Sequence, residues 1–271
     1  AAAGLVPDLV MKKGDVKSDK LYFAHRCLAD ADVYFLDNHT DVALADTFTF
    51  RSVRRAAELW NPVDGRCYAL PLISTDSVSM SLALRMSPRE SYFIVLSDQP
   101  DTLPSVMWPG SGREAEISGS WDVYFSSEWG GPGHVTFHEL TDWTAHADPR
   151  IKYYSGTAIY RNRFSVHRNI PEEKVFLKLS ALGAAARIVV NGVEVATVWC
   201  SPWEADLTDV VREGDNEVEI NVVNSLMNRM IGDASLPADQ RVTYAYPEIA
   251  EPEDALVPSG LVGVSLLYRN E

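Results

Sequence analysis

The feature of this sequence that most constrains its fold is a pair of β-branched runs on either side of Asn191-Gly192. Asn-Gly suits a two-residue hairpin turn, because both turn positions need positive φ angles. The second run continues to Trp199 and Trp203, which bracket a Cys-Ser-Pro segment where the chain must leave the sheet. We therefore predict a β-hairpin whose two indoles either form a platform for a sugar ring or pack in the wall of a β-sandwich.

Short apolar runs that alternate with polar residues recur along most of the chain. Large apolar residues occupy every second position from Val78 to Met86, and the alternation returns from Asn216 to Asn224. A strand with one buried and one solvated face gives this pattern. Short strands with turn signals roughly every 8 to 12 residues are typical of β-sandwiches. The sequence therefore predicts an all-β protein with two antiparallel β-sandwich domains.

A segment rich in proline, glycine and polar residues, 98–114, separates the two sets of expected strands. This composition disfavours regular strand pairing, so we place the domain boundary there. The expected organisation is a linker at 1–18, a small β-sandwich at 19–97, a linker at 98–114 and a larger sandwich at 115–271.

Three local features of the larger domain concern its loops. Residues 142–148 predict a short helical turn with Thr141 or Asp142 as its N-cap. Asn224 falls on the buried face of its strand, so its side chain must either tie down the following loop or face a site. Residues 225–259 are expected to be irregular, and long irregular segments in compact domains are usually functional or interfacial.

The charge of the chain excludes some classes of partner. Acidic residues outnumber basic ones by 38 to 24, which gives a formal net charge of −14. This excess disfavours nucleic acids and anionic membrane surfaces, because both require clustered positive charge, whereas a neutral polysaccharide is indifferent to it. The sequence shows no apolar run long enough to span a bilayer and no stretch with the pattern of a signal peptide.

Cysteine and histidine give no clear metal signal. The three cysteines, Cys27, Cys67 and Cys200, are an odd number without Cys-x-x-Cys spacing. Neither a disulfide framework nor a zinc site is therefore indicated, although one pair could bridge. His25 lies on an expected strand, and we interpret it as a core or interface residue rather than a metal ligand.

A calcium site is considered for Asp206, Thr208 and Asp209. Their spacing lacks the glycine and the clustered oxygen ligands of a dedicated calcium loop, so capping of a helical turn is the preferred role. We predict no metal site and no cofactor, and calcium binding stays an open alternative.

Scattered motifs carry a resemblance to a known family. The motifs are 23–35, 57–65, 142–144, 151–160, 189–192, 198–199, 202–203, 206–208, 214–216, 223–224, 228–233 and 258–261. Together they resemble the C-terminal region of glycoside hydrolase family 106, the bacterial α-L-rhamnosidases and their relatives. The later motifs are also similar to the galactose-binding-like jelly roll that serves as the sugar-binding domain of family 2 glycosidases.

The resemblance implies that the catalytic carboxylates lie elsewhere. In this family the paired carboxylates are expected in a (β/α)-barrel that precedes the sandwiches, and this chain lacks the alternating strand-helix pattern of a barrel. We therefore expect no catalytic residue and no hydrolysis by this chain alone. The parent protein is expected to be periplasmic or extracellular.

The expected role is that of a non-catalytic module that supports the barrel of a rhamnosidase-type enzyme and holds rhamnose-containing glycans. The alternatives are a structural scaffold without sugar affinity and an autonomous lectin-like protein. Candidate residues either contact the sugar or rest against the missing barrel. They are Tyr153, Tyr154, Trp199, Trp203, Asn224, Asn228, Arg229 and Asp233.

Overall fold

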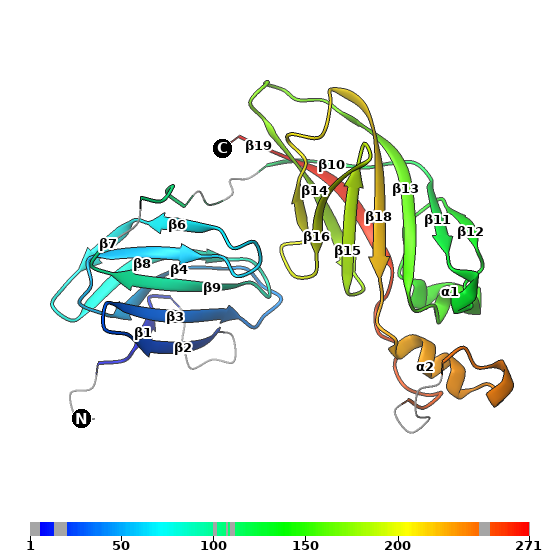
Figure 1. Ribbon diagram of the computed structural model, residues 1–271, viewed down its shortest axis with the longest axis horizontal. Coiled ribbons are helices and arrows are strands. Elements are labelled where there is room, and N and C mark those ends of the chain that lie inside the picture. Colours follow the sequence, from blue (N-terminus) through cyan, green and yellow to red (C-terminus); the bar gives the residue numbers. More distant parts are fainter. Residues whose placement is uncertain are drawn as a thin grey trace. The chain divides into compact units, whose positions relative to one another are not determined.

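The computed structural model describes residues 6–13, 21–99, 102–106, 108, 112–243 and 250–270. The chain divides into two compact units (Figure 1). The division falls inside segment 98–114, where the sequence changes composition. Unit 1 comprises Ala1–Trp108 with Cys200–Pro202, and unit 2 comprises Pro109–Trp199 with Trp203–Glu271.

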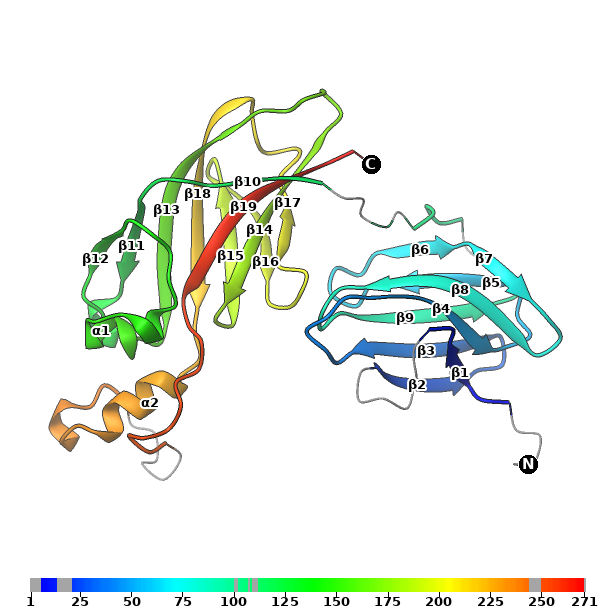
Figure 2. The same ribbon diagram turned by 180° about the vertical axis from the view of Figure 1, so that it is seen from behind.

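Unit 1 is built from β1 (Leu9–Met11), β2 (Leu21–Cys27), β3 (Ala31–Asn38), β4 (Leu44–Arg51), β5 (Ala56–Trp60), β6 (Cys67–Leu70), β7 (Leu72–Thr75), β8 (Ser79–Met86) and β9 (Ser91–Ser97). They form two antiparallel sheets, with strand orders β1-β4-β8-β7 and β2-β3-β9-β5-β6 (Figure 2). One core joins the inner faces and includes Leu36, Phe48 and Leu82, all fully buried. The predicted alternation is confirmed from Met80 to Met86, where the large apolar positions are buried and the intervening ones are not, but it is wrong at Val78, which precedes β8 and is 45% exposed.

The expectation that residues 1–18 form only a linker is wrong for residues 9–11. These form β1, which pairs with β4 in the register Leu9↔Phe50 and Met11↔Phe48. Leu9 joins the core, so the strand is held by backbone pairing and one buried side chain. A three-residue strand is too short to show a period-two pattern, which is why the sequence did not indicate it.

Unit 2 is built from β10 (Arg113–Glu116), β11 (Trp121–Phe125), β12 (His134–Phe137), β13 (Thr157–Val166), β14 (Lys174–Leu182), β15 (Ala185–Val190), β16 (Val193–Val198), β17 (Glu204–Asp206), β18 (Gly214–Val223) and β19 (Leu261–Arg269). Its two antiparallel sheets have the orders β10-β19-β14-β17 and β12-β11-β13-β18-β15-β16. The linker expected up to residue 114 is too long, because Arg113 and Glu114 already pair with β19. Both units are thus antiparallel β-sandwiches, as the alternation predicted.

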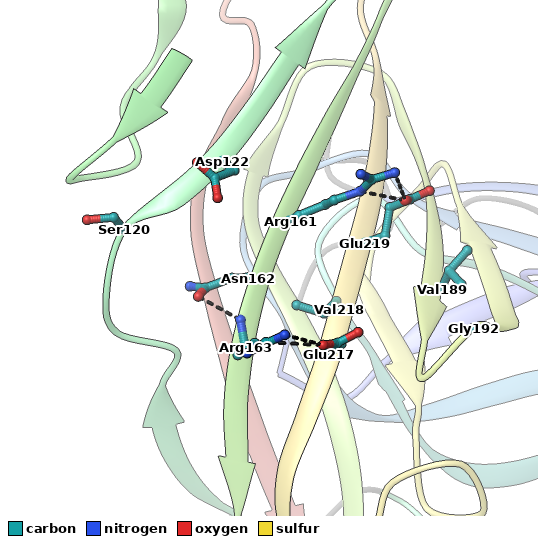
Figure 3. Close-up of a pocket in the computed structure, with 10 residues that line it drawn as sticks. All are labelled: Ser120, Asp122, Arg161, Asn162, Arg163, Val189, Gly192, Glu217, Val218 and Glu219. Atoms are coloured by element: carbon teal, nitrogen blue, oxygen red, sulfur yellow. Dashed lines mark hydrogen bonds and ion pairs between the residues drawn. The ribbon is translucent and has the colours of Figure 1, made fainter. Parts of the chain in front are cut away.

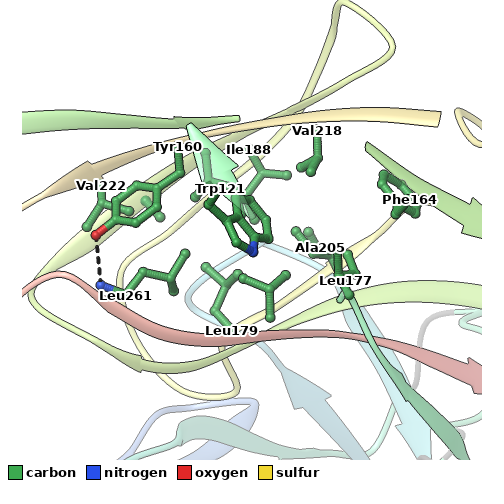
Figure 4. Packing of buried hydrophobic residues seen from close by; sticks show 14 of the residues in the cluster. Trp121, Tyr160, Phe164, Leu177, Leu179, Ile188, Ala205, Val218, Val222 and Leu261 are labelled. Atoms are coloured by element: carbon green, nitrogen blue, oxygen red, sulfur yellow. Dashed lines mark hydrogen bonds between the residues drawn. The ribbon is translucent and has the colours of Figure 1, made fainter. Parts of the chain in front are cut away.

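The core of unit 2 lies between its two sheets (Figure 4). Trp121 and Tyr160 from one sheet and Leu177 and Leu179 from the other are at most 2% exposed. The Tyr160 hydroxyl accepts a hydrogen bond from the backbone N–H of Leu261 at 3.3 Å. This bond lets a phenol occupy an apolar core without an unpaired oxygen.

The hairpin predicted at Asn191-Gly192 is confirmed as β15 and β16. The two turn residues have φ angles of 52° and 80°. The Asn191 side chain also donates to the Val210 carbonyl at 3.0 Å and accepts from the Glu217 N–H at 3.1 Å. Asparagine is therefore favoured here by its side-chain bonds as well as by its tolerance of positive φ.

Helices occupy the loops of unit 2, and α1 and α2 both lie at the end of the sandwich where β18 stops (Figure 2). The turn predicted at 142–148 is confirmed as η2, with Asp142 as an N-cap that accepts from the Thr144 N–H at 2.9 Å. The expectation that residues 225–259 are irregular is wrong for α2. This helix has no side-chain N-cap and follows closely on a strand, so no sequence signal marked its start. The helices are η1 (Ser127–Trp129), η2 (Trp143–Ala145), α1 (Pro149–Lys152), α2 (Met227–Ala234) and η3 (Ala238–Gln240).

Within the described part of the chain, no helix has both the length and the apolar character that a membrane span requires. Cys27, Cys67 and Cys200 are all free thiols.

Candidate functional site

Helix α2 carries three of the candidate residues, and all three are buried. Asn228, Arg229 and Asp233 are 2%, 7% and 2% exposed. Arg229 and Asp233 are four residues apart, so they lie on one face of the helix, with Nε and Oδ1 3.3 Å apart. A buried ion pair needs further hydrogen bonds to offset the loss of hydration of its charges. Groups around α2 donate such hydrogen bonds to the Asp233 carboxylate.

Two side chains of α2 fasten the segments that follow the helix. Asp233 Oδ2 accepts hydrogen bonds from the N–H groups of Val242 and Thr243 and from the Thr243 hydroxyl, at 2.7 to 3.0 Å. The Asn228 amide donates to the carbonyl of Val257 at 2.7 Å and accepts from its N–H at 2.8 Å. These residues therefore hold the backbone on both sides of 244–249 against the helix.

Asn224 does what its position in the sequence predicted, because its side chain ties down a later loop. Its Oδ1 accepts from the Gly260 N–H at 2.7 Å, and the side chain is buried. A Cβ atom on Gly183 would lie 2.1 Å from the same oxygen, so any larger residue there would have to displace the Asn224 side chain. Asn224 Nδ2 and the nearby Ser259 hydroxyl have no hydrogen-bond partner among the described residues. Within that part of the chain, one buried amide donor beside Gly260 is thus left free.

The adjacent residues Tyr153 and Tyr154 both pack against other parts of unit 2. Tyr154 is fully buried, and its hydroxyl accepts from the Ser126 N–H and donates to the Thr157 carbonyl, each at 3.1 Å. Burial raises the pKa of this phenol. Tyr153 is half-buried and lies so close to Gly232 of α2 that a Cβ there would be 2.7 Å from its ring. A direct sugar contact by these tyrosines stays a prediction.

The two tryptophans of the hairpin differ in exposure. Trp199 is 57% exposed, whereas Trp203 is partly buried and packs against the core of unit 2. The Trp203 carbonyl accepts from the Leu179 N–H at 2.8 Å, which fixes it beside β14. Of the two alternatives for this pair, packing in the sandwich wall applies to Trp203, and Trp199 alone offers an open indole face.

The outer face of the larger sheet of unit 2 contains a hollow that the sequence did not single out (Figure 3). Arg161 and Arg163 of β13 lie opposite Glu219 and Glu217 of β18 in the strand register. Both pairs form ion pairs at 2.8 Å. In the sequence, the alternation of β18 indicated that Glu217 and Glu219 face outward. The pairing of β13 with β18 was needed to show that two arginines lie opposite them. The lining residues are Ser120, Asp122, Arg161, Asn162, Arg163, Val189, Gly192, Glu217, Val218 and Glu219.

Two carboxylates of this hollow are held in the ionised form. Hydrogen bonding from Asn221, and next from Arg161, lowers the pKa of Glu219. Hydrogen bonding from His134, at 2.8 Å, lowers the pKa of Asp122. A glycosidase general acid needs a raised pKa so that it carries a proton near neutral pH. These groups suit hydrogen bonding to a polar ligand and not proton donation.

An aromatic ring adjoins the hollow. Tyr124 shares the outward face of β11 with Asp122 and is 39% exposed. The Arg161 guanidinium carbon lies 5.3 Å from the centre of the Tyr124 ring. Flat aromatic faces next to convergent polar groups are typical of ligand sites.

Asp206, one of the three residues considered for a calcium site, has a role in capping. Asp206 Oδ1 accepts from the Thr208 N–H at 3.0 Å, so this carboxylate caps the turn that follows β17. Among the described residues, one group of potential metal ligands converges elsewhere, in unit 1, and consists of His25, Cys27 and Asp32.

Comparison with known proteins identifies relatives for both units. Residues 1–72 match the family model of glycoside hydrolase family 106, described as alpha-L-rhamnosidase. Residues 141–253 match the galactose-binding domain-like model of glycosyl hydrolase family 2.

Two relatives place these matches within much longer proteins. A putative beta-glucuronidase from Formosa agariphila is 33% identical over 172 residues, which are 54% of this chain and 15% of that protein. The structure of a rhamnosidase from Novosphingobium sp. PP1Y matches 97% of this chain at 30% identity and a TM-score of 0.82, and the match covers 25% of that chain. This chain therefore spans a quarter or less of these two relatives.

Proposed function

We propose that this chain is a non-catalytic module that supports the catalytic barrel of a rhamnosidase-type enzyme. One part of the chain matches glycoside hydrolase family 106, and another matches the galactose-binding-like domain of family 2. The observation that carries the proposal is the structural likeness to the Novosphingobium rhamnosidase. It extends over 97% of this chain and only 25% of that one, so most of that enzyme lies outside the shared part. The parent enzyme would act in the periplasm or outside the cell.

The buried polar network of α2 supports a structural role. Asn228 and Asp233 bond the backbone of neighbouring loops and Arg229 pairs with Asp233, so these side chains build a fixed surface rather than line an open cavity. Rigid loops at one end of a sandwich are a suitable base for another domain.

Exposed apolar residues around α2 provide the surface for that domain. Leu226 is the N-cap residue of α2, Val223 ends β18, and Val257 is bonded to Asn228. Trp129 precedes Gly130, where an added Cβ atom would lie 3.0 Å from the Arg229 guanidinium. These four apolar residues, Trp129, Val223, Leu226 and Val257, which we call the α2 patch, are 39% to 54% exposed. Neighbouring apolar side chains in water are typical of a surface that a partner covers, and the catalytic barrel is the occupant we propose.

The test is complementation with the barrel of the parent enzyme, expressed as a separate polypeptide. The chain alone should release no nitrophenol from 4-nitrophenyl α-L-rhamnoside, and it should bind the barrel and raise its soluble activity. Leu226→Glu should abolish binding, whereas Val193→Glu, at the exposed hairpin turn, should not. Turnover by the purified chain alone would overturn the non-catalytic role. Equal barrel binding by both variants would overturn docking through the α2 patch.

A second function, glycan binding, is favoured by the hollow in unit 2. It combines ionised carboxylates, guanidinium groups and the Tyr124 ring, which suit hydroxyl groups and the apolar face of a sugar. Calorimetric titration with rhamnose and rhamnose-containing oligosaccharides, with and without calcium, tests it. Binding that is lost in Tyr124→Ala and kept in Trp199→Ala would support this hollow. The reverse pattern would assign the sugar platform to Trp199. If folded protein gave no heat of binding, glycan binding would be refuted and support of the barrel would be the one proposed role that stands.

A further inference from the structure

A small group of polar side chains lies on β2 and β3 of unit 1. His25 and Cys27 are two residues apart on β2, so they point to the same face of the strand. Asp32 on β3 lies directly opposite Cys27 in the strand register. A hairpin closed by a hydrogen bond from the Leu28 N–H to the Ala31 carbonyl, at 2.7 Å, therefore brings all three together.

The distances among the three side chains match those of a metal site. Cys27 Sγ is 3.0 Å from Asp32 Oδ1 and 3.7 Å from His25 Nε2, and the latter two atoms are 3.5 Å apart. Ligands of a tetrahedral zinc ion at ordinary bond lengths are separated by about 3.3 to 3.6 Å. Only the sulfur and the carboxylate oxygen would have to move apart, by about half an ångström.

We propose that His25, Cys27 and Asp32 bind a zinc ion through Nε2, Sγ and Oδ1, with the fourth position open to water or a ligand oxygen. The mixture of thiolate, imidazole and carboxylate is a ligand set that zinc accepts, and three protein ligands are typical of open sites. On binding, the Cys27 thiol releases its proton to solvent and its sulfur forms the metal bond.

Neighbouring groups orient each of these ligands. The other ring nitrogen of His25, Nδ1, is 3.5 Å from Asp8 Oδ1, and the imidazole stacks on Tyr34 with ring centres 4.0 Å apart. The Ser52 hydroxyl donates to Asp32 Oδ2 at 2.6 Å, which leaves Oδ1 to face the sulfur. Carboxylate and hydroxyl partners of this kind are the usual supports of metal ligands.

Access and local charge are compatible with a cation. His25 and Asp32 have side chains 9% and 12% exposed, whereas Cys27 is exposed and borders a hollow on the surface of unit 1. The two nearby guanidinium groups also pair with carboxylates. Arg51 pairs with Asp8, and Arg54 pairs with Asp98 at 2.8 Å and more distantly with Asp32 Oδ2 at 3.9 Å, which leaves Asp32 Oδ1 on the side of the proposed ion. The competing account is a plain hydrogen bond from the Cys27 thiol to Asp32, with no ion.

The sequence did not indicate this site, because the familiar zinc signal is a pair of cysteines spaced two apart. Here the spacing is His-x-Cys within one strand, and the third ligand comes from across a tight hairpin. The proposal departs from the interpretation of His25 as a core or interface residue rather than a metal ligand. The His25 side chain is 9% exposed, and its Nε2 lies 3.7 Å from Cys27 Sγ.

The experiment uses untagged full chain, freed of metal by chelation and titrated with zinc in a calorimeter. We expect one ion per chain, at least a hundredfold weaker binding in Cys27→Ser and His25→Gln, and unchanged binding in the control Cys67→Ser. Asp8→Asn should weaken affinity by about 10- to 100-fold, the usual effect of losing a supporting carboxylate.

Two readouts keep the result independent of folding defects. Cobalt(II) should give a thiolate charge-transfer band in the wild type and the Cys67→Ser control, and no such band in Cys27→Ser. Zinc should also slow alkylation of Cys27 by iodoacetamide, measured by mass spectrometry, and leave Cys67 unchanged. Absence of stoichiometric zinc binding, or equal binding by Cys27→Ser, would overturn the proposal in favour of the thiol–carboxylate hydrogen bond.

Discussion

Removal of the Asp233 carboxylate should loosen helix α2 more than any other single change in its polar network. Asp233→Ala leaves Arg229 as a buried charge without its partner, and loss of one member of a buried pair costs about 3 to 5 kcal/mol. It also leaves the N–H groups of Val242 and Thr243 without their acceptor. We therefore expect α2 to open about a hundred- to several-thousand-fold more often.

Hydrogen exchange measured by mass spectrometry on peptides that cover 226–243 reports this opening directly, because a short helix at the end of a sandwich can open without global unfolding. Protection in the strands of unit 2 should be retained. The exposed Asp239 of η3 gives a matched control, and Asp239→Ala should change the opening free energy by less than about 0.5 kcal/mol.

A double-mutant cycle separates the ion pair from the loop contacts. In Arg229→Met with Asp233→Ala no charge of the buried pair remains, so this variant should be more stable than Asp233→Ala alone, although the loop bonds stay lost. If Asp233→Ala exchanged like the Asp239→Ala control, or if Arg229→Met gave no recovery, the buried pair would not be what stabilises α2.

Three further predictions concern unit 2. Gly192→Ala should cost about 1 kcal/mol in urea unfolding, because φ is 80° but open space surrounds the new Cβ; a cost above roughly 3 kcal/mol would mean an unseen clash. Gly183→Ala should cost about 1 to 3 kcal/mol, because its Cβ would meet Asn224 Oδ1 at 2.1 Å, and the penalty should shrink in an Asn224→Ala background; equal penalties in both backgrounds would refute this contact. Hydrogen bonds lower the pKa of Glu219 in the folded protein. Its contribution to stability should therefore be present above the unfolded-state pKa of about 4.3 and be lost as the pH falls through the folded-state pKa. Glu219→Gln should show a weaker acid dependence of urea unfolding than wild type, and identical pH profiles would contradict this assignment.

Local rules that act over a few residues predicted the sandwiches well. Asn191-Gly192 specified its hairpin because few residues other than asparagine and glycine tolerate two successive positive φ angles. The alternation in β8 and β18 predicted their buried faces because the side-chain period of a strand is two. Asn224 was expected either to tie down the following loop or to face a site, and its bond with the Gly260 N–H fits the first alternative.

Features that depend on distant partners were not predictable in the same way. β1 exists because β4 offers an edge to pair with, and α2 because Val242, Thr243 and Val257 supply partners for its buried polar side chains. The hollow of unit 2 required the register of β13 against β18. In each case the sequence contained the residue types, but the pairing between segments was needed to show that they meet.

The carboxyl groups whose pKa is clearly shifted are consistent with the proposed non-catalytic role. Glycoside hydrolysis needs two carboxyl groups with different tasks, and the general acid must hold its proton near neutral pH. Every described carboxyl group with a clear pKa shift has its pKa lowered, because hydrogen-bond donors such as His134 beside Asp122 or Ser265 and Lys178 beside Glu114 favour the charged form. Groups held in this way accept hydrogen bonds and pair strands, but they do not deliver protons. These carboxylates are thus suited to accepting hydrogen bonds, and under the proposed function the proton donor that cleavage requires lies in the barrel.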